Sequence, residues 1–153
     1  MAFLSSMNIV ASGMTAQQLR LDVVAENVTN STTTRTEAGG SYRRKMVVFQ
    51  SVAGRDDFRA AMARAAEGLT PNAGAPTAGG VRVTQIVEDP SPMKLVYDPT
   101  HPDANEDGYV EMPNVDMVKE MTDAMAATQA YSANVTAFNT LKSVVAKGLE
   151  IGR

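Results

Sequence analysis

The chain has 153 residues, 44% of them hydrophobic and 20% charged, and this balance predicts a soluble, folded protein of one ordinary domain. Its net charge of −3 argues against nucleic-acid binding, which needs clustered Lys and Arg, and the only dense basic cluster, Arg43-Arg44-Lys45, is expected to form a solvated face beside a strand. The absence of cysteine excludes disulfides, thiol catalysis and thiolate metal sites.

Residues 1–30 form the first of three zones and predict a long N-terminal helix. Apolar residues recur every seven positions, with others three places later, which is the a/d pattern of a helix that packs along another helix. Ser6 is a candidate cap, and Asn27 and Asn30 are candidate stop residues. Gly13 lies inside the pattern and either permits close approach of another helix or lets this one fray. The predicted seam residues are Met7, Val10, Met14, Leu21, Val24 and Val28.

This end of the chain does not resemble a targeting segment. The first basic residue is Arg20, so the positively charged region of a secretory signal is missing, and no long apolar run follows Met1. No stretch approaches the roughly 20 apolar residues of a membrane span. We therefore expect no cleaved signal peptide and no membrane span, so that any export takes another route.

Residues 31–113 make a middle zone that is predicted to be rich in β-structure. Between its runs of β-branched residues, Phe58–Ala65 has a short helical pattern, and Thr70–Gly80, rich in Pro, Gly and Ala, predicts a flexible loop. We expect residues from about 50 to 86 to form a flexible insert. The predicted strands are Met46–Phe49, Val81–Val87, Lys94–Tyr97 and Tyr109–Val110.

Residues 114–153 predict a second long helix. Asn114, after Pro113, is the expected N-cap, and Asp116 in the first turn suits the helix dipole. Apolar residues follow 3–4 spacing with no Gly or Pro before Gly148, so the helix should be about 50 Å long. The predicted seam residues are Met117, Met121, Tyr131, Val135, Phe138, Leu141, Val145 and Leu149.

Both helices carry more apolar surface than a single helix pair can bury. Helices that are apolar on more than one side usually have more than one neighbour. Composition and spacing leave two readings open, an ordinary helical bundle and the subunit of a polymer. The apolar residues outside the two seams are Ile9, Leu19, Val23, Val118, Met125 and Val144.

One motif suggests a metal site but is incomplete. Asp103-x-Asn105-x-Asp107-Gly108 matches the first half of an EF-hand calcium loop. The twelfth position, which should carry a bidentate Glu, is Asn114. The segment therefore predicts a tight turn stabilised by Asn and Asp side chains, and no metal site.

The sequence also offers no catalytic constellation. His101 is the only histidine, the glycines of the middle zone are not followed by Gly-Lys-Ser/Thr, and no pair of carboxylates can be placed across a cleft. We expect no catalytic residues, no cofactor and no enzymatic activity.

Several separated segments resemble one protein family. The N-terminal segment resembles the signature that flagellar rod, hook and hook-associated proteins share, including the Ala and Asn alternation that ends their first helix. The later segments are similar, more narrowly, to the C-type proximal rod proteins of the bacterial flagellar basal body. In the range from about Gln50 to Ile86 the resemblance is lost, and there the chain is expected to carry a longer insert than the family. The segments that carry the resemblance are Asn8–Asp22, Ala25–Asn30, Thr33–Lys45, Asp98–Val110, Pro113–Val115 and Ala130–Arg153.

The resemblance implies a mainly α fold with a β-rich middle region, in which the terminal helices pair as a coiled-coil-like inner domain. It implies a structural subunit that polymerises with copies of itself and other rod subunits into part of the periplasmic drive shaft and export channel. The implied partners are the membrane-ring or adaptor proteins of the basal body and the flagellar type III export apparatus, with export that leaves no cleaved signal. The alternative is a monomeric helical binding module, calcium-regulated in its sharpest form.

Overall fold

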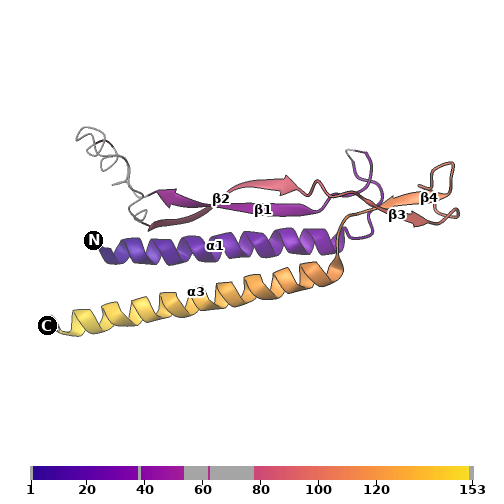
Figure 1. Ribbon diagram of the computed structural model, residues 1–153. Coiled ribbons are helices and arrows are strands. Elements are labelled where there is room, and N and C mark those ends of the chain that lie inside the picture. The colour runs from indigo at the N-terminus through magenta and orange to yellow at the C-terminus, as the bar shows by residue number, and fades with distance from the viewer. Residues whose placement is uncertain (1, 38, 54–61, 63–77, 152–153) are drawn as a thin grey trace. The chain divides into compact units, whose positions relative to one another are not determined.

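The computed structural model describes residues 2–37, 39–53, 62 and 78–151. Its two long elements are helix α1 (Ala2–Thr29) and helix α3 (Met117–Ile151), which lie near the two ends of the chain (Figure 1). The 35 residues of α3 correspond to about 52 Å of helix. The predicted architecture, mainly helical with a strand-containing middle region, is confirmed.

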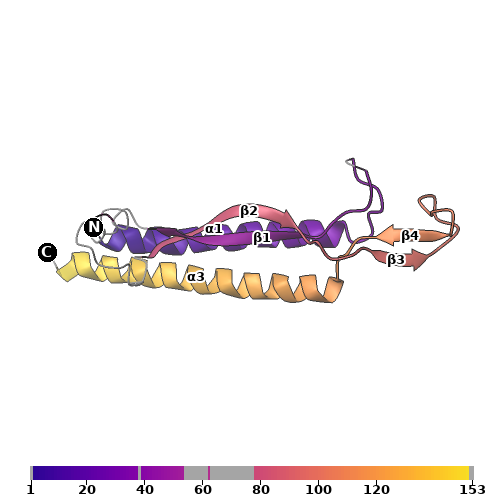
Figure 2. The ribbon, with the colours of Figure 1, turned by 45° about the horizontal axis from the view of Figure 1, so that its top comes forward.

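The middle region forms two small sheets. Strand β1 (Lys45–Ala53) pairs with β2 (Ala78–Glu88), and β3 (Lys94–Tyr97) pairs antiparallel with β4 (Tyr109–Met112), as Figure 2 shows. All four predicted strands are present. The first two extend well beyond the predicted limits, so that residues 50–53 and 78–86 of the expected flexible insert are strand. The predicted helical pattern at 58–65 lies outside the described residues except for Met62, which is helical.

The start of α3 differs from the prediction. The carboxylate of Asp116 accepts a hydrogen bond from the Val118 amide at 3.0 Å, so Asp116 is the N-cap and the helix begins at Met117. Asn114, the predicted cap, instead bonds to the backbone of the middle region. The cap was misplaced because an Asn before a helix satisfies strand backbone equally well.

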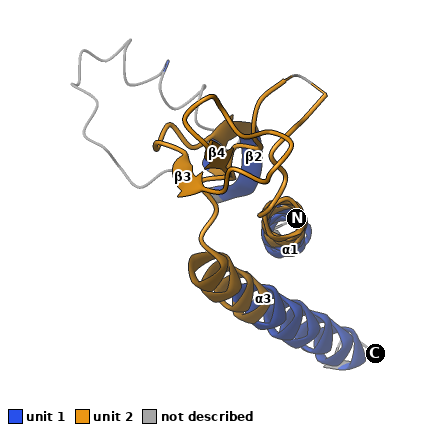
Figure 3. Cartoon of the chain, turned by 90° about the vertical axis from the view of Figure 1, so that its right-hand side faces the viewer, with its two compact units in different colours: residues 1–16, 49–84, 130–153 blue, residues 17–48, 85–129 orange. Residues whose placement is uncertain are grey.

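The chain divides into two compact units that each take part of both helices (Figure 3). Unit 1 comprises residues 1–16, 49–84 and 130–153, and unit 2 comprises residues 17–48 and 85–129. Nearly all buried residues that the structure describes belong to unit 2. In unit 1 they are Ala16 and Gly80, and in unit 2 they are Val23, Val24, Asn27, Tyr42, Arg44, Gly108, Val110, Pro113, Val115, Glu120 and Ala127.

Within unit 1, close packing depends on small residues. A Cβ built on Gly13 would lie 3.0 Å from Nδ2 of Asn134, so Gly13 permits close approach of α3, which was one of the two predicted alternatives. On β2, Gly80 has φ +105° and a Cβ there would lie 2.5 Å from Oγ of Ser12. That hydroxyl accepts a hydrogen bond from the Val81 amide at 3.0 Å, which joins the strand to α1.

Candidate functional site

The most heavily buried polar cluster of unit 2 is centred on Arg44, directly before β1. Its Nε donates to Oε1 of Glu120 at 2.6 Å, and its Nη atoms lie 3.2 Å from Asp123 and 3.5 Å from Asp89. Arg44 is 7% exposed and Glu120 is fully buried. Burial alone would lower the pKa of Arg44, but the Glu120 hydrogen bond and the three carboxylate charges outweigh it and raise that pKa.

Asn27 of α1 extends this cluster. Its amide nitrogen donates to Glu120 at 3.0 Å and to the Lys45 carbonyl at 2.9 Å. Its carbonyl oxygen accepts from the Lys45 amide at 2.8 Å and from the Tyr42 hydroxyl at 3.0 Å. All four hydrogen-bonding positions of the side chain are therefore used, which is what a fully buried amide needs.

The remaining members tie the cluster to the loop before β3. The side chain of Asn114 accepts from the Arg44 amide at 2.8 Å and donates to the carbonyls of Asp89 and Ser91, each at 3.2 Å. Hydrogen bonds from Ser91, and more weakly the charge of Arg44, lower the pKa of Asp89. We call Asn27, Tyr42, Arg44, Asp89, Asn114, Glu120 and Asp123 the polar lock.

The polar lock bears on two sequence predictions. Arg44 was expected on a solvated face but is buried, whereas its neighbour Arg43 is exposed. Of the two candidate stop residues, Asn30 directly follows the last residue of α1, Thr29, whereas Asn27 lies inside the helix and its side chain bonds to the backbone of Lys45. Because successive side chains of an extended chain point to opposite sides, this alternation could have indicated that Arg44 is buried where Arg43 is exposed.

Tyr42 lies against the same cluster. Its hydroxyl donates to Asn27, and burial, with the nearby charges of Glu26, Glu120 and Glu88, raises its pKa to about 12. The neutral phenol is therefore the form that the folded state accepts, and it acts here as a hydrogen-bond donor.

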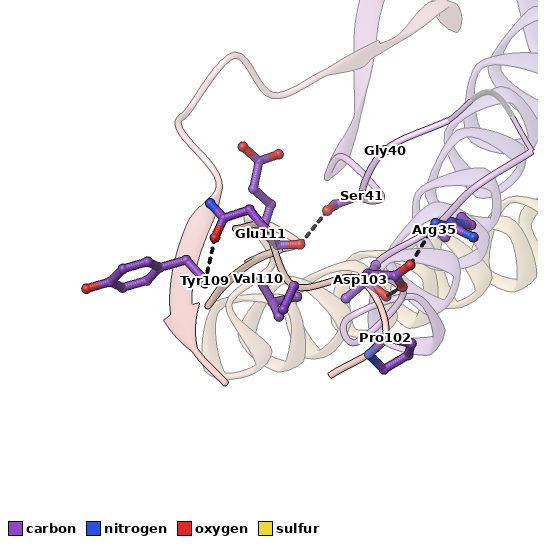
Figure 4. A pocket seen from close by; sticks show the side chains of 11 residues that line it. Arg35, Gly40, Ser41, Pro102, Asp103, Tyr109, Val110 and Glu111 are labelled. Atoms are coloured by element: carbon purple, nitrogen blue, oxygen red, sulfur yellow. Dashed lines mark hydrogen bonds and ion pairs between the residues drawn. The ribbon is translucent and has the colours of Figure 1, made fainter. Parts of the chain in front are cut away.

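The calcium-like segment forms the predicted turn. Oδ1 of Asn105 accepts from the amides of Asp107 and Tyr109 at 3.1 and 2.8 Å. Asp103 accepts from the Thr34 hydroxyl at 2.8 Å and pairs with Arg35 at 3.0 Å. A cavity of about 380 Å³ lies beside these residues, between the 34–41 loop and the turn (Figure 4). Of the two acidic residues that line it, Asp103 and Glu111, the carboxylate of Asp103 is already engaged by Thr34 and Arg35.

The seam residues predicted for assembly fall into three groups by burial within the chain. Val24 is buried, and Met117, Met121 and Leu149 are exposed, with exposed fractions of 37%, 55% and 71%. The others are partly buried: Met7, Val10, Met14, Leu21, Val28, Tyr131, Val135, Phe138, Leu141 and Val145. Their role in assembly stays a prediction.

Two further findings concern classes of site. Among the described residues, no group of three or more His, Cys, Asp or Glu side chains is placed to hold a metal ion. The helices that the structure describes include none long and apolar enough to cross a bilayer.

Two long terminal helices and a strand-containing middle region define a mainly helical protein, whose small core in unit 2 is closed by the polar lock. Two family models match the chain, "Flagella basal body rod protein" over residues 7–35 and "Flagellar basal body rod FlgEFG protein C-terminal" over residues 106–151. The chain is 47% identical to the flagellar basal-body rod protein FlgC of Bacillus subtilis over 97% of each chain. It is 41% identical to the protein of that name in Borreliella burgdorferi, over 99% of this chain and 98% of that one.

The chain belongs to the flagellar basal-body rod protein family, and it is a structural subunit of that rod. With the FlgC protein of Escherichia coli O157:H7 it shares 41% identity in an alignment of 153 positions that covers 100% of each chain. The longer insert expected near residues 50–86 stays a prediction.

Proposed function

We propose that this chain polymerises through its terminal helices into the proximal part of the rod, together with copies of itself and other rod subunits. In this proposal the helices pack as a coiled-coil-like inner domain around the axial export channel, and the strand-containing region lies outside it. The rod crosses the periplasm as a drive shaft. The further partners are the membrane-ring or adaptor proteins and the type III export apparatus, through which the chain leaves the cell interior without a cleaved signal, and the subunit catalyses nothing.

The observation that carries this proposal is an apolar stripe on the outer side of α3. Met117, Val118, Met121 and Met125 follow helical spacing and are 37%, 73%, 55% and 66% exposed. On the other side of the same turns, Glu120 and Ala127 are fully buried. An exposed row of large apolar side chains beside a filled inner face indicates a further protein neighbour. Methionine suits contacts with non-identical neighbours because its unbranched side chain repacks easily.

The polar lock supports the mechanical part of the proposal. A shaft that transmits torque needs subunits that do not shear internally. Arg44 connects the start of β1 to two acidic residues of α3, and Asn27 connects α1 to the same cluster. Buried polar contacts of this kind specify one alignment of the elements they join, because any shift leaves a charge unpaired.

The test is a pair of substitutions on α3 in a strain that lacks this protein. Met121→Lys with Met125→Lys should leave the isolated chain folded, because both side chains are exposed, and should abolish rod completion and swimming. Rods are scored by electron microscopy of basal bodies, and folding by circular dichroism of the purified chain.

The control is Ala126→Lys, which places one positive charge on the same helix, as each of the two methionine substitutions does. Ala126 is exposed and lies seven residues after the exposed Lys119, on the same side of the helix. A lysine at position 126 therefore adds a positive charge to a helix face that already carries a positive charge. This variant should swim. Normal rods in the double methionine variant would refute the proposed interface.

A further inference from the structure

The β3–β4 hairpin presents an apolar face that the chain itself does not cover. The antiparallel register pairs Leu95 with Glu111 and Tyr97 with Tyr109, so these four side chains share one face of the sheet. Leu95, Tyr97 and Tyr109 are 64%, 65% and 43% exposed. On the opposite face Val110 is 2% exposed, and its cross-strand partner Val96 is 46% exposed. We call Leu95, Tyr97, Tyr109 and Glu111 the hairpin face.

This face is held in one conformation although a two-stranded sheet alone is only marginally stable. The rings of Tyr97 and Tyr109 meet edge to face with centroids 5.3 Å apart. Gly108 has φ +80°, and a Cβ on it would come within 3.0 Å of the Tyr97 ring. The Tyr109 ring points away from Asp103 and Arg35 (Figure 4). A rigid exposed aromatic pair loses little conformational entropy when a partner covers it.

Charge is divided unequally between the two units. In the sequence of unit 2 there are seven Lys or Arg and thirteen Asp or Glu, and in that of unit 1 there are seven and four. Glu106, Asp107 and Glu111, all exposed, lie in or beside the hairpin. Two copies that met through unit 2 on both sides would repel each other, whereas unit 2 of one copy attracts unit 1 of another.

Unit 1 carries a surface that complements the hairpin face. On α3, Val144 is 61% exposed and the exposed Lys147 lies one turn further along the same side. Beside Lys147, Gly148 has nothing within 4 Å of the position that a Cβ would occupy, so an aromatic ring can approach the backbone there. We call Val144, Lys147 and Gly148 the receiving surface.

We propose that the hairpin face of one copy docks on the receiving surface of a second copy, with Glu111 paired to Lys147. The contact joins unlike surfaces, so it repeats from copy to copy and builds an open assembly and not a closed pair. This inference rests on the proposed polymerisation and names one of its interfaces.

A charge exchange tests the pairing. Glu111→Lys and Lys147→Glu, each alone, should reduce rod formation and swimming, and the variant with both changes should recover them. Glu106→Lys, in the exposed turn but off the hairpin face, is the matched control and should swim normally. Failure of the double variant to recover would refute the pairing.

A crosslink locates the contact. A photoreactive phenylalanine replaces Tyr97 in a tagged copy that is expressed beside an untagged copy, basal bodies are purified and irradiated, and the joined peptides are sequenced by mass spectrometry. The expected product joins Tyr97 of one copy to the peptide with Val144 and Lys147 of the other. A crosslink to a different segment or to a different rod protein overturns this inference, while the presence of rods leaves the proposed polymerisation standing. If the chain with the photoreactive residue in place of Tyr97 forms no rods, the charge exchange alone decides whether Glu111 pairs with Lys147.

Discussion

At the scale of single residues, the Arg44 side chain determines how unit 2 is held together. It faces three carboxylates of the polar lock; one of these, Glu120, has no exposed surface, and another, Asp123, also pairs with Arg20 at 3.1 Å. A buried ion pair often contributes little net stability, because both groups lose their hydration. Removing one partner strongly lowers the stability, because it leaves the other charge buried and unpaired.

Arg44→Met should therefore lower the free energy of unfolding by about 3–5 kcal/mol, since Glu120 would keep only its bond from Asn27. The adjacent Arg43→Met, at an exposed position, should change it by no more than about 0.5 kcal/mol. Urea unfolding followed by circular dichroism measures both. Adding Glu120→Leu to Arg44→Met should restore part of the loss, because the fully buried carboxylate is then no longer left without its cation. If the two arginine variants were equally stable, the contacts of Arg44 with the carboxylates of the polar lock would not form in solution.

The polar lock could not be predicted from the sequence, and the reason is physical. Arg43, Arg44 and Lys45 are all basic and look alike in sequence, and only the alternation along an extended chain distinguishes the middle one. Its partners Glu120 and Asp123 lie 76 and 79 residues away, and no local pattern connects them. The Asx-stabilised turn at Asn105 was predictable because all its hydrogen bonds are made within four residues.

At the scale of elements, the long helices were predicted well because a 3–4 spacing of apolar residues accumulates over many turns. Their ends were predicted less well, since Asn27 and Asn114 carry side chains that serve caps and distant strands equally. The lengths of β1 and β2 were underestimated because their extensions contain exposed polar residues and glycines. Packing against α1 at Gly80 and Ser12 adds contacts there that strand propensity does not include.

The two helical glycines offer a matched test of helix packing. Gly148→Leu meets open space and replaces a poor helix former, so it should raise stability by about 0.5–1 kcal/mol. Gly13→Leu gains the same propensity but forces a side chain against Asn134, and overpacking of this kind costs about 1–3 kcal/mol. Thermal unfolding of the two variants should move in opposite directions. A similar gain in both would mean that α3 does not pack closely on Gly13 in solution.

At the scale of the whole molecule, burial is concentrated in one unit although both helices run through the two units. Unit 2 holds almost all of the buried residues that the structure describes, together with the polar lock. Unit 1 holds the first part of α1 and the last part of α3, where partly buried and exposed apolar residues predominate. This difference fits a subunit whose unit 1 is completed by neighbours in the rod.

The dilute chain should therefore open unevenly along each helix. Local opening requires less free energy where few side chains are buried, and amide hydrogen exchange reports that free energy residue by residue. We expect residues 130–151 of α3 to exchange faster than residues 117–129, and residues 2–16 of α1 to exchange faster than residues 17–29. Each comparison lies within one helix, so differences between helix and strand do not affect it. Purified rods are the reference, and there both parts of each helix should be protected, because neighbouring subunits bury what the single chain exposes. Uniform slow exchange along α3 in the dilute chain would mean that unit 1 is already stably folded without partners. Stabilisation of these helix ends by neighbouring subunits could then not contribute to the free energy of polymerisation.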